Sequence, residues 1–246
     1  MTIEISEAAG VRSLHFGTPW VQGAVRVARP WALELEYTRD MLLPLLLRPD
    51  DWPQRVLMVG LGSGSLAKFL YRHRPHCMLH VVELDPQVIQ AAHQHFKLPA
   101  ADARLQVSAA DGFEWVKQDT EFYDLILLDA FDLNARAHRL ESAEFYAACQ
   151  QRLRPEGWIA CNLLTLHRSH AATRRALASV FGNGLHLLPP LRGRQCGGTA
   201  CLCAVASARL QRTAHTRCAV AQANPTQPIA VDFTYGTVLK PVRRPA

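Results

Sequence analysis

Short apolar runs alternate with segments of helical periodicity through most of the chain. The runs expected to form strands lie at residues 55–60, 80–84, 104–110, 122–130, 157–164, 184–190 and 199–206. The segments expected to form helices lie at residues 65–73, 85–96, 111–118, 142–153 and 170–181. This alternation is typical of repeated βα units. We therefore predict an α/β fold with a Rossmann-like, mostly parallel seven-stranded sheet.

The N-terminal part of the chain follows a different pattern. Residues 11–16 and 20–27 are short alternating runs separated by Gly-Thr-Pro, which predicts a short β-hairpin. Residues 32–47 predict a helix that leads into the core. We divide the chain into a hairpin with the start of a linker helix (1–40), a Rossmann-like domain (41–207) and a Pro-rich and Arg-rich C-terminal segment (208–246).

Charge is distributed unevenly along the chain. Residues 1–156 carry 16 basic and 20 acidic residues, whereas residues 157–246 carry 11 basic residues and 1 acidic residue. An arginine-rich stretch of this kind can attract nucleic acid. Aromatic residues do not interleave with these arginines, so we favour a solvated basic face or an oligomer contact, and we expect a homodimer.

The composition predicts a soluble, cytoplasmic protein. A chain of 246 residues, 49% of them hydrophobic, can bury one substantial core. Its N-terminus lacks the features of a secretory signal, and no segment approaches the roughly twenty apolar residues of a membrane span. Seven scattered cysteines fit a reducing compartment. The cysteines within residues 196–203 lack the paired Cys-x-x-Cys arms of a zinc site, so we expect no metal.

A glycine-rich turn follows the first predicted strand of the sheet. Gly60, Gly62 and Gly64 lie directly before a predicted helix, and glycines allow a tight turn and the close approach of a ligand. Glu83 ends the next strand, where a carboxylate can accept hydrogen bonds from both hydroxyls of a ribose. The spacing, without a further phosphate-binding motif, indicates a nucleoside that lacks pyrophosphate. The alternative is a plain tight turn between strand and helix.

Carboxylates follow the next two strands. Asp111, with Gly112, begins a helix, which it can cap with about 1 kcal/mol of stabilisation; alternatively, it can accept a hydrogen bond from the amino group of adenine. Asp129 and Asp132 follow an apolar strand, at the sheet edge where doubly wound folds bind ligands. A carboxylate there can bind a cationic amine and take up its proton as a general base. The alternative is capping of the loop.

Taken together, these motifs resemble those of the spermidine synthase (polyamine aminopropyltransferase) family, in the same order and at similar spacing over about residues 11–165. The matching positions are Gln22 in the hairpin, Tyr37 in Glu-Tyr-Thr-Arg-Asp-Met, the glycine turn, Glu83 in Glu-Leu-Asp, Asp111 in Asp-Gly-Phe-Glu, and the pair Asp129 and Asp132. The resemblance implies a sheet of the S-adenosylmethionine-dependent methyltransferase type. It also implies transfer of an aminopropyl group from decarboxylated S-adenosylmethionine to an amine.

The resemblance assigns roles to these positions as well. Asp129 would activate the amine as the catalytic base, with Asp132 and Tyr37 binding the amine substrate and Gln22 contacting the sugar of the donor. The residues that would hold the adenosyl co-substrate are Gly60, Gly62, Ser63, Gly64, Glu83, Asp111 and Gly112. The domain at 41–207 would then be the nucleoside-binding catalytic domain.

The chain also departs from the family pattern. Ser63 stands where the family has an aspartate that holds the amino group of the donor, Thr38 and Arg39 follow Tyr37 where the family has His-Glu, and Asp-Ala-Phe-Asp replaces Asp-Ser-Ser-Asp. Two alternatives therefore stay open. One is a methyltransferase that uses intact S-adenosylmethionine, whose carboxylate could accept a hydrogen bond from Ser63. The other is a non-catalytic module that binds a nucleoside.

Overall fold

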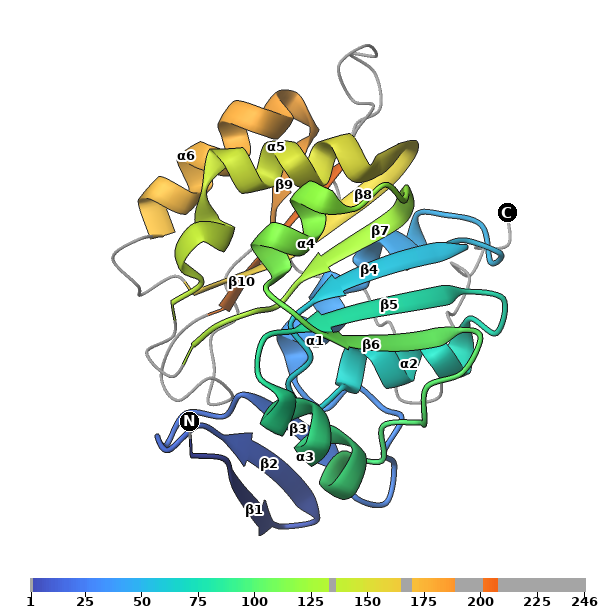
Figure 1. Cartoon of the computed structure of the whole chain (residues 1–246), viewed down its shortest axis with the longest axis vertical. Coiled ribbons are helices and arrows are strands. Elements are labelled where there is room, and N and C mark those ends of the chain that lie inside the picture. The colour runs from blue at the N-terminus through green and yellow to red at the C-terminus, as the bar shows by residue number, and fades with distance from the viewer. Residues whose placement is uncertain (1, 133–135, 165–169, 189–200, 208–246) are drawn as a thin grey trace, which may run out of the picture.

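The computed structural model describes residues 2–132, 136–164, 170–188 and 201–207. A central sheet with helices on both faces dominates the fold (Figure 1). Its strands are β4 (Arg55–Val59), β5 (Met78–Glu83), β6 (Leu105–Ala109), β7 (Tyr123–Leu128), β8 (Leu153–Leu164), β9 (Leu185–Leu187) and β10 (Cys201–Ser207). They pair in the order β6-β5-β4-β7-β8-β10-β9. The strands from β4 to β8 run parallel, and β10 is antiparallel to both of its neighbours.

Helices cover both faces of this sheet. They are α1 (Glu36–Met41), α2 (Ser65–His73), α3 (Pro86–Phe96), α4 (Gly112–Gln118), α5 (Ala143–Arg152) and α6 (His170–Phe181), with short 3-10 turns at Leu43–Leu46, His138–Glu141 and Gly182–Gly184. Residues of β4 alternate between the two faces: Val56 and Met58 pack with α1, α2 and α3, whereas Leu57 and Val59 pack with α4, α5 and α6. A strand buried on both faces needs a continuous apolar run, which is the pattern seen in the sequence.

The predicted α/β class and the mostly parallel sheet of seven strands are confirmed. Helices α2 and α6 begin and end at the predicted residues. Helix α3 starts as its sequence indicates, because Asp85 caps it by accepting a hydrogen bond from the backbone N–H of Gln87 at 2.8 Å and Pro86 occupies its first turn.

A separate antiparallel sheet precedes the central one in the chain. Its strands are β1 (Glu4–Ala8), β2 (Val11–His15) and β3 (Gly23–Arg26), paired in that order. The pairing of β2 with β3 confirms the predicted hairpin. Strand β1 was not predicted, because only Ile5 of its five residues is apolar and large, and most of the strand is exposed.

The helix predicted over residues 32–47 is shorter than expected. The α-helix covers only Glu36–Met41, and a 3-10 turn follows at Leu43–Leu46. Pro44 accounts for the end of the α-helix, because proline has no N–H to donate and its ring clashes with the carbonyl four residues earlier.

Several sequence expectations fall outside the described residues. They include the basic segment 208–246 with its arginines, and Cys196 of the cysteine cluster. The division into domains, the homodimer and the choice of a basic face over nucleic acid stay predictions. Among the helices of the described residues, none is long and apolar enough to cross a membrane.

Lys68 is a charged residue in the core. It lies on α2, fully buried, and its Nζ donates a hydrogen bond to the backbone oxygen of Phe96 at 2.6 Å, at the C-terminal end of α3. Burial, with a smaller contribution from the charge of Lys97, lowers the pKa of Lys68 from 10.5 to about 7. The folded protein therefore disfavours the protonated lysine that the unfolded chain readily carries.

This burial predicts a pH-dependent stability. Between pH 7 and about 10 the unfolded chain binds more protons at Lys68 than the folded chain does, so the contribution of Lys68 to the free energy of unfolding rises with pH. Lys68→Met removes that titration. The wild type should therefore gain stability relative to Lys68→Met over this range, by an amount on the order of a few kcal/mol. Urea unfolding at several pH values measures the difference, and a difference that does not change with pH would contradict the prediction.

Candidate active site

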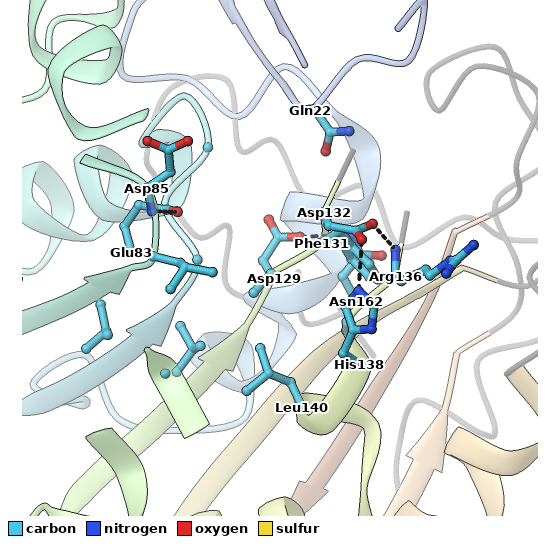
Figure 2. A pocket seen from close by; sticks show the side chains of 18 of the residues that line it. Gln22, Glu83, Asp85, Asp129, Phe131, Asp132, Arg136, His138, Leu140 and Asn162 are labelled. Carbon is cyan, nitrogen blue, oxygen red and sulfur yellow. Dashed lines mark hydrogen bonds and ion pairs between the residues drawn. The ribbon is translucent and has the colours of Figure 1, made fainter. Parts of the chain in front are cut away.

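A cavity of about 530 Å³ lies at the carboxyl ends of the parallel strands (Figure 2). Its walls come from the N-terminal hairpin, the glycine turn, the ends of β5, β7 and β8, and the start of α4. The structure brings together most of the residues singled out in the sequence. Those that line the cavity are Gln22, Tyr37, Gly60, Gly62, Glu83, Asp111, Gly112, Asp129 and Asp132.

The glycine turn packs against the backbone at the end of β7. Gly60 has a φ of +94°, and a Cβ added to it would lie 2.1 Å from the backbone oxygen of Asp129. Any side chain at this position would therefore displace β7 or the turn. Because the backbone N–H of Asp129 donates to the oxygen of Val59 at 2.9 Å, the two strand ends are held at a fixed separation.

Ser63 and Gly64 do not line the large cavity. Ser63 is buried beneath the hairpin, where a Cβ added to Gly23 would lie 2.6 Å from the Ser63 hydroxyl oxygen. The hydroxyls of Ser63 and Ser65 are hydrogen-bonded at 2.9 Å, and Ser65 donates to the backbone oxygen of Ala24 at 3.1 Å. Ser63 thus joins the turn to the hairpin, and it lines a separate, much smaller pocket that also borders Asp129.

Glu83 holds the glycine turn and the start of the next loop together. Its carboxylate accepts hydrogen bonds from the backbone N–H of Leu61 at 2.8 Å and from that of Asp85 at 3.0 Å. Burial raises the pKa of Glu83, and these backbone donors oppose that shift. Each carboxylate oxygen can accept a further bond, so a ligand in the cavity can still donate to Glu83.

Asp111 caps a helix at the edge of the cavity. Its Oδ1 accepts hydrogen bonds from the backbone N–H groups of Phe113 at 2.8 Å and Glu114 at 3.3 Å, so it caps α4. The residue also lines the cavity. The cap fixes the carboxylate at a helix N-terminus, where a second oxygen is geometrically available to a ligand.

Asp129 is held by two neutral side chains. The Tyr37 hydroxyl donates to its Oδ2 at 3.0 Å, and the Asn162 side-chain amide donates to its Oδ1 at 2.9 Å. Burial raises the pKa of Asp129, whereas these two hydrogen bonds act in the opposite direction. Asp129 is therefore held by neutral donors, and no cation is bonded to it among the described residues.

The sequence analysis missed Asn162. It lies in β8, nearly buried, and its Oδ1 accepts no hydrogen bond within the described part of the chain. The only sequence signal was a single amide in an otherwise apolar run, Trp158–Leu164. Asn162 also lines the cavity, next to the Asp129 carboxylate that its amide N–H holds.

Asp132 lies in the loop after β7 and differs from Asp129 in its surroundings. Its Oδ1 accepts from the backbone N–H of Arg136 at 2.9 Å, and its Oδ2 lies 2.9 Å from His138 Nε2 (Figure 2). Asp132 therefore caps this loop, and its role in binding an amine stays a prediction. The sequence analysis also missed aromatic and basic residues that line the cavity, namely Phe16, Trp20, Phe131, Arg136, His138 and Arg139.

Comparison with known proteins places this site in a wider context. Residues 36–180 match the spermine/spermidine synthase domain family. The polyamine aminopropyltransferase of Chromobacterium violaceum is 33% identical over 187 residues, which are 76% of this chain and 71% of that protein.

No group of three or more potential metal ligands gathers among the described residues.

Solved structures share the fold. A probable spermidine synthase from Corynebacterium glutamicum has a TM-score of 0.71 at 20% identity, over 89% of this chain and 81% of that one. Human methyltransferase-like protein 13, solved in complex with SAH, has a TM-score of 0.61 at 23% identity, over 74% of this chain and 86% of that one. The same sheet therefore occurs in proteins named for different transfer reactions, and the fold does not choose between them.

The bonds of Glu83 lead to a prediction for Glu83→Gln. A glutamine offers one acceptor oxygen, so its NH2 group would face one of the two backbone donors and leave it unpaired. We expect a loss of about 1–3 kcal/mol in the free energy of unfolding and at least tenfold weaker binding of methylthioadenosine, measured by calorimetry. Glu144→Gln is the control, because Glu144 makes an exposed ion pair with Lys117 outside the cavity. Equal affinities in the two variants would contradict the role of Glu83.

Proposed function

Because this chain belongs to the spermine/spermidine synthase family, we propose that it transfers an aminopropyl group from decarboxylated S-adenosylmethionine to an amine. The observation that carries this proposal is Asp129, a carboxylate held by Tyr37 and Asn162 in a cavity that Glu83 also lines. The arrangement combines a site for a nucleoside with a poised proton acceptor.

The nucleoside would occupy the end of the cavity formed by the glycine turn, Glu83 and Asp111. Glu83 can accept hydrogen bonds from the ribose hydroxyls, and Asp111 can accept one from the amino group of adenine. Gln22 approaches the cavity from the hairpin (Figure 2) and would contact the sugar. These residues would orient the donor so that its aminopropyl chain extends toward Asp129.

Asp129 would act as the general base. The amine nitrogen attacks the aminopropyl carbon next to the sulfonium, a C–N bond forms, and the C–S bond breaks with its electron pair going to sulfur. The product nucleoside is a neutral thioether, and the proton lost by the amine passes to Asp129. Tyr37 and Asn162 fix the carboxylate by donating to its two oxygens. In-line positioning supplies much of the acceleration.

The two alternatives receive less support. The hypothesis of methyl transfer depended on a hydrogen bond from Ser63 to the carboxylate of intact S-adenosylmethionine. The Ser63 hydroxyl is hydrogen-bonded to that of Ser65, and Ser63 does not line the large cavity. A non-catalytic module has no use for a carboxylate that two side chains hold in a partly buried place, since desolvation disfavours its charged form. An aminopropyl donor still lacks the family's usual anionic partner at position 63.

Binding of the co-substrate tests the proposal directly. The purified protein should bind decarboxylated S-adenosylmethionine more tightly than the intact form in calorimetric titration. When an amine is added, it should release methylthioadenosine, the thioether product of aminopropyl transfer. Asp129→Asn should bind the donor but lower kcat at least 100-fold, since general-base catalysis contributes about that much or more. Tighter binding of the intact cofactor together with methyl transfer would overturn the proposal.

The hydrogen bond from Tyr37 predicts a shift in the pH profile. Asp129 accepts a proton only when ionised, so kcat/KM should fall as the pH drops through its pKa. The Tyr37 bond lowers that pKa, so Tyr37→Phe should move the acidic limb of kcat/KM to higher pH. Tyr71→Phe is a matched control, because Tyr71 donates to Asp102 at 2.8 Å on an exposed surface. A limb that moves equally in both variants, or in neither, would refute the assignment.

A further inference from the structure

Three side chains with basic groups, those of Arg136, His138 and Arg139, line the cavity and follow Asp132 in the chain. In Figure 2, Glu83 and Asp85 lie on one side of Asp129, whereas Arg136 and His138 lie on the other. The acceptor would enter on this second side, because the nucleoside would occupy the first.

These side chains differ in whether they already pair with an acid. Asp132 is engaged by His138 and by the backbone N–H of Arg136. Arg139 forms an ion pair with Glu114 at 3.0 Å, and its guanidinium lies 3.8 Å from the centre of the Phe113 ring. The guanidinium of Arg136 makes no ion pair with any described residue.

This arrangement is poorly suited to a simple diamine. A diamine carries a second ammonium beyond the nitrogen that attacks, and that group needs an acid. Asp132, the acid nearest in sequence to Asp129, accepts a hydrogen bond from the backbone N–H of Arg136, and the Arg136 guanidinium in the same cavity would repel a second ammonium. An arginine fork instead matches a carboxylate or a phosphate, which it can bind through two parallel hydrogen bonds.

We infer that the acceptor is an amine that also carries an anionic group, a carboxylate or a phosphate, which Arg136 binds. Apolar side chains, those of Trp20, Phe131 and Leu164, line the cavity as well, so a hydrocarbon spacer between the two groups fits this environment. This inference rests on the proposed function, and it names the substrate class of the same site. The product is a secondary amine that retains the anionic group.

Four acceptors of equal carbon chain test the inference. They are butylamine, 1,4-diaminobutane, 4-aminobutanoate and 4-aminobutylphosphonate, each supplied with decarboxylated S-adenosylmethionine. We expect kcat/KM for at least one of the two anionic amines to exceed that for butylamine roughly tenfold or more, since a charge-assisted hydrogen bond contributes about 1.5–3 kcal/mol. The anionic amine that is preferred tells carboxylate recognition from phosphate recognition.

Arg136→Gln locates the effect. The ratio of kcat/KM for the preferred anionic amine to that for butylamine should fall about tenfold in this variant. Arg152→Gln should leave the ratio unchanged, because Arg152 lies on α5 next to Phe122 and does not line the cavity. A ratio that survives in Arg136→Gln would overturn the inference.

The outcomes separate this inference from the proposed function. A preference for 1,4-diaminobutane over both anionic amines would overturn the inference and leave aminopropyl transfer intact. Absence of transfer to all four amines would count against the proposed function instead. In that case calorimetric titration of the same amines, with methylthioadenosine present, decides the inference: tighter binding of an anionic amine that Arg136→Gln abolishes supports it, and any other order of affinities overturns it.

Discussion

Close backbone packing around the glycine turn is the constraint on which the site depends. Gly60 meets the backbone oxygen of Asp129 on one side, and Gly23 meets Ser63 on the other. Both contacts lie at distances that no side chain would fit. The turn is thus packed tightly between the end of β7 and the hairpin. This packing fixes the distance between the glycine turn and the carboxylate of Asp129. A general base is effective only at such a fixed distance from the reacting atoms.

The two acids after β7 differ in the groups that bond to them. Asp129 has neutral donors, Tyr37 and Asn162, and burial raises its pKa. A bonded cation would stabilise the ionised form and make the carboxylate a weaker base, whereas neutral donors orient it with a smaller loss of basicity. Asp132 instead has His138 and the backbone N–H of Arg136 as partners, so its bonds shape the loop that follows β7.

The sheet could be predicted because each central strand is buried on both faces and therefore reads as a continuous apolar run. The order and register of the strands could not be predicted from the sequence. Leu128 pairs with Cys161 in the β7–β8 ladder, which places the next residues, Asp129 and Asn162, side by side. No residue near Asn162 in the sequence indicates that it contacts Asp129. Ser63 was equally misleading, since its position in the motif indicated a ligand contact and only the fold places the hairpin over it.

The cavity separates the chemistry from the choice of acceptor. Asp129 is fixed by the sheet, through its backbone bond to Val59, and its position does not depend on the loop that follows. Asp132, Arg136 and His138 belong to that loop and are held chiefly by one another. The charge of side chains in the loop can therefore differ without breaking the backbone bond that positions Asp129. Arg136 in the loop beside Asp129, the proposed general base, is the arrangement expected if an aminopropyl transfer site accepts an amine that also carries an anionic group.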